Sequence, residues 1–140
     1  MNLSELAIDL YTNIFFIIKK VAKNHNISSS QLLCLHVIPS EGIAQSELAE
    51  ILCLDLSTLS RNLDKLIVKQ LVVKNISLFD SRKQTVFLTD DGEKLYLNTL
   101  NDLSSSLNSL HDFSHSSSYD IESIMNHITQ FNWLLYKQRH

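Results

Sequence analysis

The segment from Asp55 to Val68 has small hydroxyl and basic side chains on one face of an expected helix. Its leucines and isoleucine follow a helical spacing and predict an inward stripe of Leu56, Leu59, Leu63, Leu66 and Ile67, with Asp55 able to cap the helix. The opposite face then carries Ser57, Thr58, Ser60, Arg61 and Lys65. Short hydroxyl side chains let a helix approach base edges closely, and arginine can donate hydrogen bonds to a base. These residues predict a helix that binds in a DNA groove, whereas the alternative for Arg61 is a solvated helix arginine.

A second group of charged residues, Asp80, Arg82 and Lys83, follows soon after this helix. It falls between Leu71–Ile76 and Gln84–Leu88, which are rich in β-branched residues and predict the two strands of a hairpin. The charged group would then occupy the tip of that hairpin. The alternative for Arg82 is a surface ion pair with Asp80 alone.

Shorter helical segments surround these two features. Gln45–Leu52 predicts a first helix, which Ser46 can cap, and a tight turn separates it from the Asp55 helix. A further helix is expected from about Ser30 to Ile38, and Thr89 can cap a long helix after the hairpin. Two short helices, a tight turn and a basic hairpin predict a winged helix-turn-helix.

The distribution of charge supports a polyanionic partner for this region. The chain has a net charge of −3, but residues 55–83 contain six basic residues against three acidic ones, so the rest of the chain is acidic. Such asymmetry directs a positive face toward phosphates while the acidic remainder discourages indiscriminate binding. The alternative is a charged face that is only solvated.

Three long amphipathic segments flank the central region. Their apolar residues step by three and four, as in a heptad seam. The seams are Leu3, Ala7, Leu10, Ile14, Ile17 and Val21; Tyr96, Leu100, Leu103, Leu107 and Leu110; and Ile121, Ile124, Ile128, Phe131 and Leu135. A small DNA-binding module cannot cover all three, so they predict an intertwined dimerisation bundle. An intramolecular three-helix bundle is the alternative.

Composition defines the class of protein. With 140 residues, 44% of them hydrophobic, only two Gly and one Pro, the chain predicts one mainly α domain with a small β-wing. We expect a single domain over 1–140, with dimerisation helices at 1–25 and 95–140 and a winged helix-turn-helix lobe at 30–89. No apolar run is long enough to span a membrane, and acidic Glu5 and Asp9 argue against a signal peptide. Together with only two Cys, this predicts a cytoplasmic protein.

Two stretches carry a family resemblance. The order SELAEILCLDLSTLSRNLDKLIVKQLVVK followed by DSRKQTVFLTDDGEKL resembles the MarR (multiple antibiotic resistance regulator) family, and the order of helices extends the match over essentially the whole chain. The resemblance implies a homodimeric transcription factor, usually a repressor. Its recognition helices enter successive major grooves of a pseudo-palindromic operator in double-stranded DNA, and its wings reach the adjacent minor grooves.

The resemblance also assigns residues. Ser57, Thr58, Ser60 and Arg61 fall on the groove-facing part of the recognition helix, and Asp80, Arg82 and Lys83 on the wing. Arg82 matches the minor-groove arginine of the family, with Asp80 as the partner that orients it. Such regulators respond to small-molecule effectors, and the effector pocket would be lined here by Tyr11, Phe15, His36 and Tyr96.

Some positions depart from the family pattern. Gln70 occupies a turn where relatives usually have Gly, so a left-handed conformation would be costlier here. Lys74 stands where Arg is common, and Leu78 and Phe79 replace residues that are often basic. These changes predict fewer phosphate contacts.

Other candidate sites are weaker. Cys34 and Cys53 belong to no CxxC pair and are expected to be small buried hydrophobes, with redox sensing at Cys53 as the alternative. His111 and His115 have a spacing that could bind a metal on a helix, but a solvated loop pair is favoured. We therefore expect neither a metal nor a cofactor, and no catalytic constellation predicts an enzyme.

Two functions remain open from the sequence. The first is a ligand-responsive repressor that binds double-stranded DNA as a homodimer, without a membrane partner. The second is an interaction protein that keeps the MarR-like fold and regulates by binding another protein, as the acidic balance and the weakly basic wing would favour.

Overall fold

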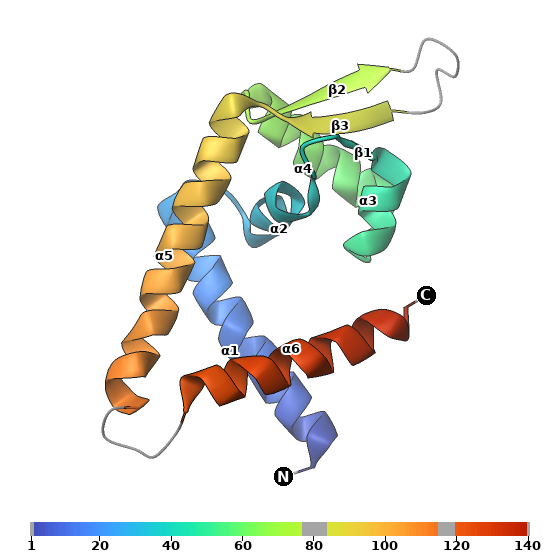
Figure 1. The fold of residues 1–140 in the computed structure, drawn as a ribbon. Coiled ribbons are helices and arrows are strands. Elements are labelled where there is room, and N and C mark those ends of the chain that lie inside the picture. The colour runs from blue at the N-terminus through green and yellow to red at the C-terminus, as the bar shows by residue number, and fades with distance from the viewer. Residues whose placement is uncertain (1, 77–83, 115–119, 140) are drawn as a thin grey trace. The chain divides into compact units, whose positions relative to one another are not determined.

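The computed structural model describes residues 2–76, 84–114 and 120–139, and the side chains of these residues except those of 110–114. Along the chain it has α1 (Leu3–Asn24), α2 (Ser29–Val37), β1 (Ile43–Ala44), α3 (Gln45–Ile51), α4 (Leu56–Val68), β2 (Val72–Ile76), β3 (Gln84–Leu88), α5 (Asp90–Ser114) and α6 (Ile121–Lys137) (Figure 1). The chain divides into two compact units, residues 1–103 and 104–140.

The described strands form one small antiparallel sheet in the order β1-β3-β2. Ile76, the last residue of β2, pairs with Gln84, the first residue of β3, and Ile43 of β1 pairs with Val86 on the other side of β3. The expected mainly α fold with a small β-wing is confirmed.

Side-chain caps define several helix ends. Ser28 and Gln31 form a reciprocal capping box at α2, and Thr89 Oγ1 accepts a hydrogen bond from the Gly92 backbone N–H at 3.0 Å, as predicted. The prediction that Ser46 caps the first helix of the pair is wrong. The cap position of α3 is Ala44, which makes no side-chain cap, and Ser46 lies inside the helix.

The core of the first unit lies between α2, α3, α4 and the sheet. Its fully buried members include Leu35, Leu48, Leu59, Leu63, Leu66 and Val86. The predicted inward stripe of α4 is confirmed for its three central leucines, and Ile67 is partly buried against them. Leu56 is 56% exposed and does not belong to the stripe. It is the first residue of α4, so its side chain leans back past the helix end rather than onto the core.

Two tight turns next to α4 require left-handed backbone. Cys53, in the turn before α4, has a φ of 54°, and Gln70, in the turn after it, has a φ of 59°. The conformation considered costly at Gln70 is therefore adopted. Backbone hydrogen bonds hold it, because Gln70 N donates to Ile67 O and Leu71 N donates to Leu66 O.

The beginning of α5 packs tightly against the chain that follows α4. Thr89 Oγ1 donates to Gln70 O at 2.6 Å, and a Cβ at Gly92 would lie 2.0 Å from the carbonyl oxygen of Leu71. Gly92 is therefore needed for a close approach of two backbones. This contact fixes the end of α4 to the first turn of α5.

The terminal seams are largely exposed within the chain. Leu3, Leu10 and Ile14 of α1 are exposed, whereas Val21 at its other end is buried. In the second unit, α6 exposes Ile124, Met125, Ile128, Phe131, Trp133, Leu134, Leu135 and Tyr136. No helix of the described residues combines the length and apolar character needed to cross a membrane.

Candidate nucleic-acid interface

The outer face of α4 carries the predicted polar residues. Ser57, Arg61 and Lys65 are exposed, and Thr58 and Ser60 are half-buried. Leu59, Leu63 and Leu66 anchor the opposite side of the helix in the core. The leucines thereby fix the rotation of α4 and leave its hydroxyl and basic side chains toward solvent.

Asp55 organises the beginning of this face. Its carboxylate accepts hydrogen bonds from Thr58 N at 2.8 Å, from Thr58 Oγ1 at 2.8 Å and from Ser57 Oγ. The predicted cap is confirmed. These bonds, above all the one from the Ser57 hydroxyl, hold the pKa of the exposed Asp55 carboxyl well below its usual range. Arg61 Nη2 in turn donates to Thr58 Oγ1 at 3.5 Å, so the arginine lies along the hydroxyl side of the helix.

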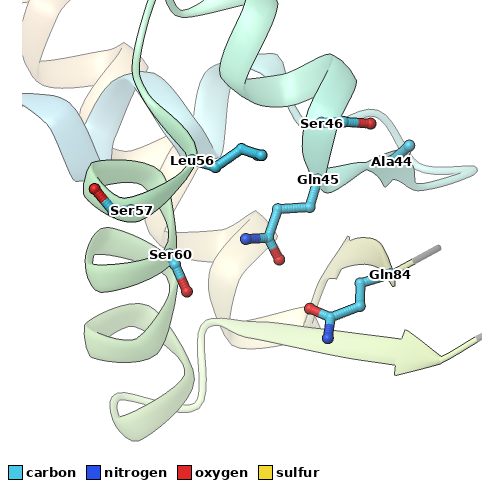
Figure 2. A pocket seen from close by; sticks show the side chains of 7 residues that line it. All are labelled: Ala44, Gln45, Ser46, Leu56, Ser57, Ser60 and Gln84. Atoms are coloured by element: carbon cyan, nitrogen blue, oxygen red, sulfur yellow. The ribbon is translucent and has the colours of Figure 1, made fainter. Parts of the chain in front are cut away.

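A concave region of about 630 Å³ lies beside this face, as Figure 2 shows. Its lining comes from the end of β1 and from α3, α4 and β3: Ala44, Gln45, Ser46, Leu56, Ser57, Ser60 and Gln84. Gln45 Oε1 is a buried side-chain oxygen without a hydrogen-bond partner among the described residues. The hollow therefore presents amide and hydroxyl groups between α4 and the beginning of β3.

Five lining residues were not among the predicted site residues: Ala44, Gln45, Ser46, Leu56 and Gln84. Gln84 is the first residue of its predicted strand and directly follows the predicted wing residue Lys83, which is the signal that the sequence offers for it. Leu56 was assigned to the core because its spacing fits the stripe.

Two lysines near α4 interact with other groups of the protein. Lys74 Nζ lies 3.3 Å from Asp64 Oδ1, and Lys69 Nζ donates to Asn26 O. Arg61 and Lys65 remain as the exposed cations of α4 itself. The predicted wing residues Asp80, Arg82 and Lys83 lie outside the described residues.

The four residues assigned to an effector pocket form two pairs. Tyr11 and Phe15 stack with ring centroids 5.7 Å apart and line a cavity of about 260 Å³ together with Ser29, Ser30, Leu33, Leu52 and Leu54. His36 Nδ1 and Tyr96 Oη share a hydrogen bond of 2.7 Å, and neither residue lines that cavity.

The cysteines differ in environment. Cys34 is fully buried, as predicted, and burial raises the pKa of its thiol to about 11. Cys53 is exposed, so the expectation of a buried small hydrophobe is wrong there. No cluster of three metal-ligating side chains occurs in the described part of the chain. His115 and the side chain of His111 lie outside it.

Two helices joined by a tight turn, with a hairpin packed beside the second helix, define a winged helix-turn-helix protein. The family model of MarR matches residues 27–83, which include α2, β1, α3, α4 and β2, so the predicted resemblance to this family is confirmed for that segment.

Solved structures match over nearly the whole chain. A MarR transcriptional regulator from Methanosarcina mazei Go1 is 25% identical, with a TM-score of 0.78 over 97% of this chain and 94% of that one. A MepR variant from S. aureus bound to an oligodeoxyribonucleotide is 18% identical, with a TM-score of 0.61 over 99% of both chains. NadR in complex with 4-hydroxyphenylacetate is 18% identical, with a TM-score of 0.76 over 99% of this chain and 93% of that one. The comparison with curated proteins gives no match.

Proposed function

We propose that the protein is a sequence-specific regulator of transcription that binds double-stranded DNA as a homodimer. The observation that carries the proposal is the outer face of α4, where Ser57, Arg61 and Lys65 reach solvent while the leucines of the same helix are buried. A helix with this face fits a major groove, because hydroxyl and guanidinium groups can contact base edges and lysine can contact phosphate. The oligodeoxyribonucleotide bound to the related MepR variant supports a DNA partner.

A homodimer would cover the exposed apolar seams. Leu3, Leu10 and Ile14 of α1 and the apolar residues of α6 are exposed to solvent in one chain. Large exposed apolar surfaces usually mark interaction sites. In this proposal residues 1–25 and 95–140 form the dimer helices of a single 1–140 domain. They set the distance between two recognition helices near one turn of DNA, about 34 Å, on a pseudo-palindromic operator.

A small-molecule effector would act through the cavity beside Tyr11 and Phe15. Its volume of about 260 Å³ suits a small aromatic compound, and the related NadR binds 4-hydroxyphenylacetate. Leu52 and Leu54 line the same cavity and lie in the turn directly before Asp55. A ligand that prefers a shifted turn would move the beginning of α4 and weaken DNA binding, as expected of a repressor that is released by its effector.

A gel-shift titration on the DNA upstream of the protein's own gene tests the proposal. We expect a discrete complex whose affinity falls with salt and exceeds that for scrambled duplex. Equal affinity for both duplexes, or no complex at low salt, would contradict sequence-specific binding. The proposed location is the cytoplasm, and the proposed role requires no catalysis.

The second candidate is an interaction protein that regulates by binding another protein. Val68 favours it, because this apolar residue at the end of α4 is 83% exposed. The acidic balance of the whole chain favours it as well. Binding of a protein partner that is lost in Val68→Glu, together with the absence of any operator complex, would support this candidate.

A further inference from the structure

The hydroxyl groups of Ser57 and Thr58 both point to the carboxylate of Asp55. Ser57 Oγ lies 2.5 Å from Oδ1, and Thr58 Oγ1 lies 2.8 Å from Oδ2. An ionised carboxylate only accepts hydrogen bonds, so each hydroxyl must supply the hydrogen. A serine or threonine hydroxyl has one hydrogen, and each of these is therefore committed to Asp55.

The hydroxyl oxygens of Ser57 and Thr58 can then only accept hydrogen bonds from an external partner, through their lone pairs. Ser57 is exposed, so its oxygen can still accept a hydrogen bond from outside the protein. Thr58 Oγ1 already accepts a long hydrogen bond from Arg61 Nη2, at 3.5 Å. Arg61 itself can only donate. The face of α4 therefore presents an acceptor at Ser57 and, one helical turn later, a donor at Arg61.

The edges of the bases in the major groove also differ in whether they donate or accept hydrogen bonds. Cytosine and adenine offer exocyclic amino hydrogens at N4 and N6, whereas guanine O6 and N7 and thymine O4 are acceptors. We propose that Asp55 fixes the hydroxyls of Ser57 and Thr58 as hydrogen-bond acceptors, a proposal that rests on the DNA-binding function proposed above. The beginning of α4 then selects a base with an exocyclic amino group. The negative charge of Asp55 acts in the same direction, because it repels the acceptor atoms of guanine and thymine.

Selection of bound duplexes from a randomised pool tests this assignment. The position contacted by Ser57 is the one whose base preference Ser57→Ala abolishes. At that position the wild-type protein is expected to prefer adenine or cytosine over guanine or thymine by about three- to tenfold, the effect of one hydrogen bond. An adenine analogue without its N6 amino group, placed at a selected adenine, should lose the same factor.

Two variants of Asp55 separate hydrogen-bond direction from capping and charge. Glycine is also accepted at a helix cap, so the Asp55→Gly variant should fold. It frees the hydroxyl hydrogens of Ser57 and Thr58, and it should therefore remove the base preference at the position that Ser57 contacts. In Asp55→Asn the amide oxygen keeps the bonds from Thr58 N and Ser57. The amide nitrogen then faces Thr58 Oγ1, where it donates and turns the threonine hydrogen outward. This variant should therefore change the preference only at the position that Thr58→Val identifies.

Ser40→Ala is the matched control, because Ser40 Oγ also donates to a carboxylate, that of Glu41, but lies in the segment between α2 and β1. It should leave every selected position unchanged. A Ser57-dependent preference for guanine or thymine, or a folded Asp55→Gly variant that keeps the wild-type preference, would overturn the inference while leaving the DNA-binding function intact. A wild-type protein that binds no duplex would instead contradict the proposed function.

Discussion

At the scale of single residues, direct base contact and general attraction to phosphate can be separated. Arg61 and Lys65 are both exposed cations of α4, one helical turn apart. The guanidinium of Arg61 lies on the hydroxyl side of the helix, 3.5 Å from Thr58 Oγ1. A lysine ammonium is a point charge suited to phosphate, whereas a planar guanidinium can contact one base with two hydrogen bonds.

Arg61→Ala should therefore cost about 1–3 kcal/mol of binding free energy on the operator and little on random DNA. Lys65→Ala should weaken binding to both duplexes alike and reduce the salt slope by about 1. A salt titration of both variants on operator and scrambled duplexes measures the difference. Identical behaviour of the two variants would show that Arg61 does not contact bases.

The carboxyl of Asp55 predicts how stability responds to acid. Its pKa is lowered in the folded protein by hydrogen bonds from Ser57 and Thr58, so the ionised form stabilises the fold. This contribution is present above the unfolded pKa of an aspartate, about 4, and is lost as the pH falls through the folded value. The thermal midpoint of the wild type should fall more steeply below pH 4 than that of Asp55→Asn, as measured by circular dichroism. Parallel curves would contradict this role.

At the scale of elements, the sequence predicted the helices and strands around the site well. It did not predict which residues at the beginning of a helix cap it and which are buried. The strands Val72–Ile76 and Gln84–Leu88 lie within a residue of the predicted ones, because β-branched residues define them. Leu56 and Ser46 were misassigned because both lie at a helix beginning, where spacing alone does not fix which residue is the cap. The cavity beside Tyr11 could not be predicted in full, since its lining comes from segments far apart in the chain.

The turn after α4 yields a stability prediction. Gln70 has a φ of 59°, and a non-glycine residue pays about 1 kcal/mol for a left-handed conformation. Gln70→Gly should therefore raise the free energy of unfolding by up to about 1 kcal/mol, reduced by the greater entropy of glycine in the unfolded chain. Gln70→Ala retains the strain and serves as the control. Urea denaturation compares the two variants, and a less stable glycine variant would show that the Gln70 side chain contributes more than the backbone strain.

Gly92, in the first turn of α5, is a position where replacing glycine should destabilise the protein. A Cβ at Gly92 would lie 2.0 Å from the carbonyl oxygen of Leu71, a backbone atom that cannot move aside alone. Gly92→Ala should lower the free energy of unfolding by about 1–3 kcal/mol despite the better helix propensity of alanine. Asn98→Ala, at an exposed position of the same helix, is the control and should be nearly neutral. Urea denaturation of both variants measures the effect, and an unchanged Gly92→Ala protein would exclude the close approach.

At the scale of the whole molecule, the exposed seams predict self-association. Ile128 and Leu135 of α6 are about half exposed in one chain and lie on the same side of the helix. The proposed dimer buries them, and an unpaired buried carboxylate costs several kcal/mol. Ile128→Asp and Leu135→Asp should therefore yield monomers or unfolded chains.

Sedimentation velocity at micromolar concentration measures this outcome. Gln130→Asp, which adds the same charge at an exposed polar position of α6, should remain a dimer. A well-folded wild-type monomer would contradict the dimer and would favour an interaction with another protein.

The ties of Lys69 to Asn26 and of Lys74 to Asp64 also affect how quickly the protein would find its target. Each cation already bound within the protein is one fewer to displace counterions from random DNA, so non-specific complexes are weaker and shorter-lived. Non-specific sites greatly outnumber an operator in a genome. With Lys69 and Lys74 bound in this way, the proposed regulator would spend less time in such encounters and would search more by dissociation and rebinding than by long sliding along the duplex.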